Sequence, residues 1–194
     1  YPTKALAQDQ LRSLGRFQPP AGAAEFLAGV YDGDTPGNLR RRLRDGANAI
    51  LTNPDMLHQG ILPHHARWNR FFTHLKYVVI DEAHVYRGIF GSHVANVVRR
   101  LKRLCAYYGS SPQFILCTAT IANPQEHVER LTGLPFEVVA EDGSPHGGKE
   151  FVFWNPPVID EAKSARRSAN SEATLLFGEL VRQGIRRLTF ARSR

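Results

Sequence analysis

The feature that most constrains this chain is a pair of short, unbroken apolar runs separated by a long amphipathic segment. The runs cover Tyr77–Ile80 and 114–117, and such runs are typical of strands buried on both faces of a parallel sheet. Between them, apolar residues recur at three- and four-residue steps over 94–108 with basic residues interspersed, which is the period of a helix with one buried face. Strand, helix and strand in this order favour an α/β fold, with a parallel sheet and helices on both faces.

The same alternation continues along the chain. Proline at helix starts and glycine after helix ends mark the boundaries, as at Pro36 and Gly46. We predict further helices over 3–14, 36–46, 64–74, 124–131 and 172–183, and one that begins at residue 54. We predict further strands over 26–30, 47–52, 136–139, 151–154 and 186–190. The dipeptide Pro156-Pro157 and the run 163–171 indicate a linker.

Composition excludes several classes of protein. Of 194 residues, 42% are hydrophobic and 22% charged, which is typical of a globular domain. The longest apolar run, 104–108, falls far short of the ~20 residues of a membrane helix. No signal-peptide pattern opens the chain, so we expect a cytoplasmic protein with no membrane partner, associated with the nucleoid if bacterial. Two cysteines exclude a disulfide scaffold and a four-cysteine zinc site, and a net charge of +7 favours a polyanionic partner.

The ends of the sequence suggest a piece of a longer protein. Tyr1 opens the chain without an initiator methionine, and the chain stops one loop after a predicted strand. We therefore expect a fragment, truncated at the N-terminus of its sheet.

The tetrad Asp81-Glu82-Ala83-His84 directly follows the first apolar run. In open parallel sheets, ligands bind beyond the carboxyl ends of the strands, where Asp81 would stand. Its carboxylate is suited to holding Mg²⁺ through water, and Glu82 is suited to deprotonating the water that attacks a γ-phosphate. The alternative is a helix N-terminus, where acidic residues are favoured by the helix dipole. The complete tetrad on a predicted buried strand favours the catalytic interpretation.

Thr118-Ala119-Thr120 follows the second apolar run, at the same predicted edge of the sheet. The two hydroxyls would stand close to the tetrad, where they could bond His84 or Asp81 and respond to the nucleotide state. The alternative is that Thr120 only caps the next helix. Together with the tetrad, the triplet favours a coupling role.

Four segments together resemble superfamily-two DEAD/DEAH-box helicases. They are similar, in order, to motifs Ia, Ib, II and III of the first RecA-like domain: Pro2-Thr3-Lys4-Ala5-Leu6, Thr52-Asn53-Pro54-Asp55, the acidic tetrad and Thr118-Ala119-Thr120. Three further segments resemble the mitomycin-repair-factor (MrfA-like) branch, whose members are described as 3′→5′ DNA helicases in DNA repair: 148–157, 55–58 and 120–124.

The resemblance covers nearly the whole chain and implies a site for each motif. Residues 1–150 would belong to the first RecA-like domain, and 151–194 to a linker and the start of the second, with 190–194 near motif IV. ATP and Mg²⁺ would be the cofactors, with Asp81 as the magnesium anchor through water and Glu82 as the base. His84, Thr118 and Thr120 would couple the state of the bound nucleotide to the binding of the nucleic-acid strand. Thr3, Lys4, Thr52 and Asn53 would contact the sugar-phosphate backbone of single-stranded or duplex DNA.

The sequence departs from the family pattern in one respect. The family's phosphate-binding loop lies upstream of motif Ia and is absent from this sequence. The segment 143–149 matches G-x-x-x-x-G-K, but Glu150 stands where Ser or Thr would bind Mg²⁺. A strand rather than a helix is predicted after it, so we interpret this segment as a loop.

The remaining clusters of basic, histidine, aromatic and cysteine residues can be interpreted either as functional sites or as ordinary parts of the structure. The basic run 40–44 is either a second phosphate track or a solvated helix face. Basic residues 99–103 fit the outer face of a helix, and the histidines near 58–74 lack metal-ligand spacing. Three aromatic residues fit a core better than a base-stacking platform: Trp68, Phe71 and Phe72. Cys105 and Cys117 fit buried thiols.

Three hypotheses of function follow. The first is a fragment of an ATP-dependent DNA helicase or translocase. The second is a nucleic-acid-binding module without ATPase activity, whose affinity would fall steeply with salt. The third is an ATP-dependent RNA helicase, since motif contacts to the backbone do not distinguish the two polymers. We expect the first for the parent protein and the second for the isolated chain.

Overall fold

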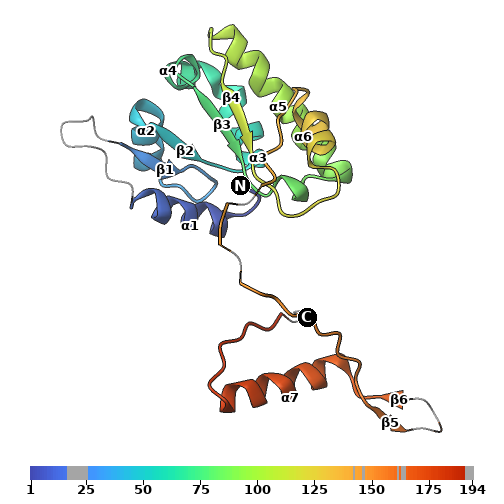
Figure 1. Cartoon of the computed structure of the whole chain (residues 1–194). Helices are drawn as coiled ribbons and strands as arrows, with labels where there is room; N and C mark the ends of the chain where they lie inside the picture. The colour runs from blue at the N-terminus through green and yellow to red at the C-terminus, as the bar shows by residue number, and fades with distance from the viewer. Residues whose placement is uncertain (17–25, 142, 146, 161, 163–164, 191–194) are drawn as a thin grey trace. The chain divides into compact units, whose positions relative to one another are not determined.

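The computed structural model describes residues 1–16, 26–141, 143–145, 147–160, 162 and 165–190. The chain forms two compact units, Tyr1–Ala140 and Glu141–Arg194 (Figure 1). Whether the domains divide at residue 150 stays a prediction, and residues 191–194, next to the predicted motif IV, lie outside the described residues.

The first unit alternates strands and helices as predicted. Its elements are α1 (Lys4–Leu14), β1 (Ala28–Val30), α2 (Gly37–Gly46), β2 (Ala49–Leu51), α3 (Pro54–Met56), η1 (Leu57–Ile61), η2 (Leu62–Trp68), α4 (Asn69–Thr73), β3 (Tyr77–Ile80), η3 (Ala83–Val85), α5 (Gly88–Tyr107), β4 (Gln113–Leu116) and α6 (Pro124–Thr132). The strands form two parallel pairs, β1 with β2 and β3 with β4.

Helices cover both faces of the first strand pair. On one face, Val30 and Leu51 pack with Ala7 of α1. On the other, α2 approaches so closely that a Cβ atom at Gly29 would lie 2.4 Å from Leu43 Cδ2. Glycine in β1 therefore permits the contact between strand and helix.

The second strand pair is covered on one face only within the described residues. Ile80, Phe114 and Leu116 pack against the buried face of α5. On the opposite face, Tyr77 and Val79 are 59% and 51% exposed. The prediction that Tyr77–Ile80 and 114–117 are buried on both faces is therefore wrong for this chain, because α5 packs against one face and no described helix packs against the other.

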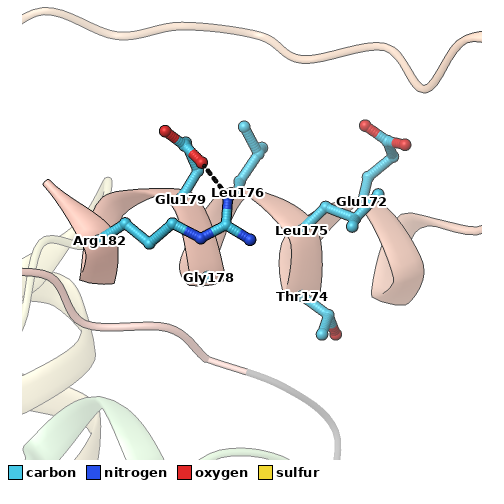
Figure 2. Close-up of a pocket in the computed structure, with 7 residues that line it drawn as sticks. All are labelled: Glu172, Thr174, Leu175, Leu176, Gly178, Glu179 and Arg182. Atoms are coloured by element: carbon cyan, nitrogen blue, oxygen red, sulfur yellow. Dashed lines mark hydrogen bonds and ion pairs between the residues drawn. The ribbon is translucent and has the colours of Figure 1, made fainter.

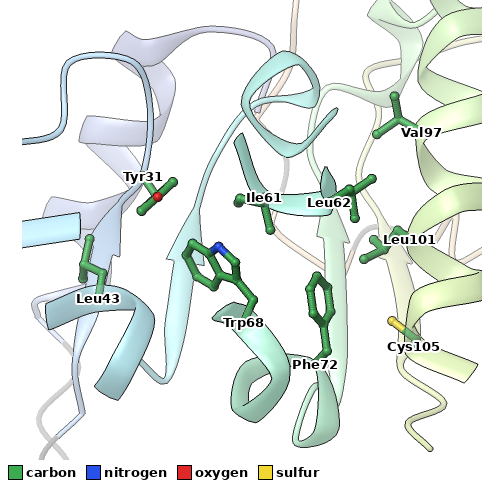
Figure 3. Packing of buried hydrophobic residues seen from close by; sticks show 9 residues of the cluster. All are labelled: Tyr31, Leu43, Ile61, Leu62, Trp68, Phe72, Val97, Leu101 and Cys105. Atoms are coloured by element: carbon green, nitrogen blue, oxygen red, sulfur yellow. The ribbon is translucent and has the colours of Figure 1, made fainter. Parts of the chain in front are cut away.

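The main core lies between the strands, η2 and α5. Trp68 and Phe72 are almost fully buried, and Phe71 packs against the same cluster (Figure 3). Ile50 of β2 and Val78 of β3 both contact this cluster, so one core joins the two strand pairs. The prediction that these aromatic residues belong to the core is confirmed.

The second unit contains β5 (Val158–Asp160), β6 (Ala165–Arg166) and α7 (Ala169–Arg182). The two strands pair antiparallel, and Ser168 caps α7 by accepting a hydrogen bond from the Ser171 N–H at 3.1 Å. The linker predicted over 163–171 is therefore wrong where it overlaps β6 and α7. The reason is that Ser168 supplies a helix start that the linker interpretation overlooked.

Three predicted strands are absent from the structure. The segments 136–139, 151–154 and 186–190 contain no strand, and Val139, Phe151 and Phe153 are 84% exposed or more. These runs are apolar enough for strands, but none of the described residues pairs with them. No helix among the described residues is long and apolar enough to cross a membrane.

Candidate active site

The ends of β3 and β4 bring the acidic tetrad next to the threonine triplet. Ile80 and Leu116 are partners in the parallel register, so the residues that follow them emerge at one edge. The N–H of Cys117 donates to Ile80 O at 3.0 Å, and the N–H of Ala83 donates to Cys117 O at 2.9 Å. These backbone bonds hold the two segments together, as the strand order predicts.

Glu82 stands in an unusual backbone conformation. Its φ and ψ angles are 52° and 40°, and it is the one non-glycine residue with positive φ in the part of the chain that the structure describes. Its N–H donates to Asp81 Oδ1 at 2.9 Å. Left-handed conformations outside glycine cost roughly 1–3 kcal/mol and are common at active sites, so the turn points to function at Glu82.

His84 lies between Glu82 and the triplet. The backbone N–H of Ala119 donates to His84 Nδ1 at 3.2 Å, so Nδ1 must accept and the ring proton must sit on Nε2. Nε2, which carries the proton, lies 3.1 Å from Glu82 Oε2. One imidazole therefore connects the carboxylate of the tetrad to the backbone of the triplet.

The threonine hydroxyls are not the groups that reach the tetrad. Thr118 Oγ1 donates to the Ala119 carbonyl at 3.0 Å, and Thr120 is exposed. The contact with His84 comes from the Ala119 N–H instead. Sequence reasoning missed Ala119, because a backbone donor has no side-chain signature.

Asp81 has a free oxygen suited to a cation. Its Oδ1 accepts the Glu82 N–H, while its Oδ2 makes no hydrogen bond or ion pair within the described residues. No group of three or more His, Cys, Asp or Glu side chains is arranged for a metal ion in the described part of the chain. A single carboxylate fits Mg²⁺, which keeps most of its waters and is usually shared with substrate phosphates.

The negative charge of Asp81 reaches two tyrosines. Burial and then the Asp81 charge raise the pKa of Tyr86 to about 12, and its side chain is almost fully buried. For Tyr1, burial comes first among the causes that raise the phenol pKa, followed by the charges of Asp81 and Cys117. Both phenols therefore remain protonated donors near the tetrad at neutral pH.

The four residues predicted to contact nucleic acid line one small hollow. They are Thr3, Lys4, Thr52 and Asn53, and they share the hollow with Ala7, Val30 and Asp32. Three of them also make local bonds: Thr3 Oγ1 accepts from Leu6 N at 3.4 Å, Asn53 Oδ1 accepts from Met56 N at 2.7 Å, and Thr52 Oγ1 donates to Tyr31 O at 2.7 Å. Lys4 pairs with Asp34. Two of the residues that line the hollow, Thr3 and Asn53, are the N-caps of α1 and α3.

Two basic side chains have their donors engaged by backbone carbonyls. Arg40 donates to Thr35 O, Asp32 O and Gly33 O at 2.8, 2.7 and 3.1 Å, and its guanidinium lies 5.4 Å from the centre of the Tyr31 ring. Lys102 donates to Thr132 O at 3.0 Å. Of the basic run 40–44, Arg40 is thus a structural residue, whereas Arg41 lies on a solvated face.

The cysteine prediction is half right. Cys105 is buried in the main core, and burial raises the pKa of its thiol. Cys117 is exposed, so the prediction that it is buried is wrong. It follows the last residue of β4, and within the described residues that edge is open.

A separate hollow lies along α7 in the second unit (Figure 2). Every residue that lines it comes from this one helix, including Glu179 and Arg182, whose side chains pair at 3.0 Å. None of the predicted site residues contributes to it, so it is not the site described above.

Comparison with known proteins assigns the family. The model of the DEAD/DEAH box helicase family matches residues 1–128. The chain belongs to the DEAD/DEAH box helicase family.

Related proteins in this family cover the whole chain. It is 50% identical over 194 residues to the ATP-dependent helicase YprA of Bacillus subtilis and 43% identical over 197 residues to the ATP-dependent helicase HRQ1 of Saccharomyces cerevisiae. The match covers 26% of YprA and 18% of HRQ1, so the chain spans about a quarter or less of these relatives.

Solved structures confirm the fold and the branch. A crystal structure of the DUF1998 helicase MrfA bound to DNA matches all of this chain and 26% of that chain, with a TM-score of 0.94 and 51% identity. A second, bound to DNA and AMPPNP, matches all of this chain and 27% of that one, with a TM-score of 0.89 and 49% identity. The predicted RecA-like fold and the resemblance to the MrfA-like branch of DEAD/DEAH helicases are therefore confirmed.

Proposed function

We propose that the whole protein is an ATP-dependent DNA helicase or translocase that moves 3′→5′ and acts in DNA repair. The observation that carries this proposal is the Glu82 carboxylate beyond the end of β3, 3.1 Å from the His84 ring, which in turn accepts a hydrogen bond from the backbone of Ala119. The relatives support it, since they are named ATP-dependent helicases and MrfA was crystallised with DNA and AMPPNP. We place the protein in the cytoplasm, at the nucleoid if its source is bacterial.

The residues of the site would divide the work of ATP hydrolysis. Asp81 would hold Mg²⁺ through water with Oδ2, and the ion would supply positive charge against the phosphates. Glu82 would take a proton from the attacking water with its carboxylate, whose Oε2 lies 3.1 Å from His84 Nε2.

His84, Thr118 and Thr120 would transmit the state of the nucleotide to the DNA site. The bond between His84 and Ala119 supports this role, since any movement of Glu82 pulls on the segment that follows β4. Thr3, Lys4, Thr52 and Asn53 would hold the phosphates of single-stranded or duplex DNA. Helix N-termini, hydroxyls and an ammonium group are suited to phosphate oxygens and carry little base information.

The test is the substitution Glu82→Gln in the whole protein. We expect ATP turnover with single-stranded DNA to fall about 10²- to 10⁴-fold, the usual contribution of a general base. Nucleotide binding should remain close to that of the wild type, because Gln keeps the size of Glu and removes its charge and basicity. Glu137→Gln, an exposed residue in a segment without helix or strand, is the matched control. Undiminished turnover in Glu82→Gln would refute the assignment.

Substrate and polarity need separate measurements. ATP turnover stimulated by RNA but not by DNA would support an RNA helicase instead, and unwinding of a 5′-tailed but not a 3′-tailed duplex would reverse the polarity. Turnover that requires Mg²⁺ and is lost in EDTA would support the role of Asp81.

The isolated chain supports a second candidate function, a nucleic-acid-binding module. The hollow that gathers Thr3, Lys4, Thr52 and Asn53 favours it. We expect the 194-residue chain to bind single-stranded DNA with an affinity that falls steeply with salt and does not respond to ATP. Lys4→Gln should reduce the salt slope by about one. A slope unchanged by this substitution would contradict a phosphate contact at Lys4.

A further inference from the structure

A side chain from α6 reaches back to the acidic tetrad. His127 Nε2 lies 2.8 Å from the carbonyl oxygen of Ala83, the residue at the centre of the tetrad. Because a carbonyl oxygen only accepts, Nε2 must carry the proton and donate. Ala83 is fully buried and His127 is half-buried, so this bond is partly buried.

The Ala83 peptide is held from several sides. Its carbonyl also accepts from the Tyr86 N–H at 3.1 Å, and its own N–H donates to Cys117 O at 2.9 Å. The residue before it is Glu82, whose left-handed conformation persists only where neighbouring contacts impose it. Loss of the His127 bond would leave the turn beside Glu82 free to relax.

The bond from His127 also connects the tetrad to the segment that follows β4. α6 begins at Pro124, a few residues after the threonine triplet, and the His127 N–H donates to Asn123 O at 3.1 Å. His127 thus belongs to the same stretch of chain as Ala119, which bonds His84. The tetrad is connected to this stretch on one side through His84 and on the other through Ala83.

From this geometry we propose that His127 is a positioning residue for the general base Glu82. It holds the Ala83 carbonyl and thereby keeps the Glu82 turn in the orientation that hydrolysis requires, and it transmits displacements of α6 to that turn. This inference rests on the proposed function of the site in ATP hydrolysis. His127 touches no reacting atom in this assignment and acts only through the backbone.

A pair of variants of similar size separates the hydrogen bond from packing. His127→Gln retains an N–H donor at about the reach of Nε2, whereas His127→Leu removes the donor. His93→Ala is the control, since His93 is an exposed histidine on α5 outside the site. The experiment uses the whole protein and measures kcat and KM for ATP with saturating single-stranded DNA, together with nucleotide affinity and the unfolding temperature. Should His127→Leu not fold, His127→Ala replaces it.

We expect His127→Leu to lower kcat about 10- to 100-fold, the loss that small misplacement of a catalytic group produces. KM and nucleotide affinity should change little, His127→Gln should recover most of kcat, and His93→Ala should match the wild type. Equal losses in His127→Leu and His127→Gln, or a fall in kcat matched by a rise in KM and a lower unfolding temperature, would overturn the inference. Undiminished kcat in His127→Leu would overturn it while leaving the proposed function intact. A wild type without ATP turnover would overturn both.

Discussion

Gly91, in the first turn of α5, passes the backbone of Tyr86 so closely that a methyl group has no room there. A Cβ atom on Gly91 would lie 2.4 Å from the Tyr86 carbonyl oxygen and 2.7 Å from its carbonyl carbon. Both atoms belong to the main chain and cannot rotate away. Alanine at this position must therefore separate the start of α5 from the segment that follows the tetrad.

Two opposing terms decide the magnitude. Replacing glycine by alanine inside a helix gains about 0.5–1 kcal/mol. Overpacking costs about 1–3 kcal/mol, and the upper half of that range applies because the clash is with backbone. We therefore expect Gly91→Ala to lower the free energy of unfolding of the first unit by about 1–2.5 kcal/mol.

Gly46→Ala is the matched control in the same unit. Its Cβ atom would lie 3.7 Å from Leu27 Cδ2, an ordinary van der Waals contact. We expect this variant to be unchanged or more stable by up to about 1 kcal/mol. Of the two alanine variants, only Gly91→Ala should therefore have a lower free energy of unfolding than the wild type.

Urea unfolding followed by tryptophan fluorescence measures both variants. The chain has two tryptophans, and Trp68 lies in the core of the first unit. In a Trp154→Phe background, Trp68 reports on that unit alone. If Gly91→Ala proved as stable as its parent, the close approach of α5 to Tyr86 would be refuted.

Three further predictions concern single side chains. Arg40→Ala should destabilise the first unit by about 1–3 kcal/mol because it removes bonds to three carbonyls, whereas Arg41→Ala should change the unfolding free energy by less than about 0.5 kcal/mol, both measured in urea. Cys117 should react with a thiol reagent in the native state and Cys105 only after unfolding, which a timed absorbance assay measures; rapid reaction of both thiols would contradict the burial of Cys105. The raised pKa of Tyr86 contributes stability that is complete below pH 10, the unfolded value, and is lost as pH rises toward about 12. Because phenylalanine does not ionise, Tyr86→Phe should lack this part of the alkaline loss of stability, about 1–2 kcal/mol after solvent screening. A variant that unfolds with the same alkaline profile as the wild type would contradict that burial.

The elements that sequence predicted well are those with a local physical signal. The period of 94–108 and the glycine after it identify α5, and Tyr77–Ile80 and 114–117 identify two neighbouring strands. The parallel order of these strands also predicted that the tetrad and the triplet would meet. Local pattern and topology agree here, so the prediction succeeded.

The errors arise where a run needs a partner that its own sequence does not describe. The segments 136–139 and 151–154 have strand composition, yet they form no strand, because pairing depends on a neighbouring edge. The prediction that Cys117 is buried was wrong for the same reason, since its burial also depends on a neighbour that its own sequence does not describe. In the site, the contacts of Ala119 and His127 involve backbone atoms, which any residue type offers, so sequence alone could not have found them.

The hydrogen bonds of Arg40 and Lys102 separate two effects of a positive charge, direct contact with a phosphate and attraction over a distance. Several of their N–H groups are engaged with carbonyl oxygens, so each side chain keeps fewer donors for direct contact with a phosphate. The charges themselves remain, and Coulomb attraction acts over about a Debye length without any direct contact. Such residues accelerate the encounter with a polyanion at low ionic strength, while the lifetime of the complex depends on other groups. Their removal should slow association and leave the dissociation rate nearly unchanged.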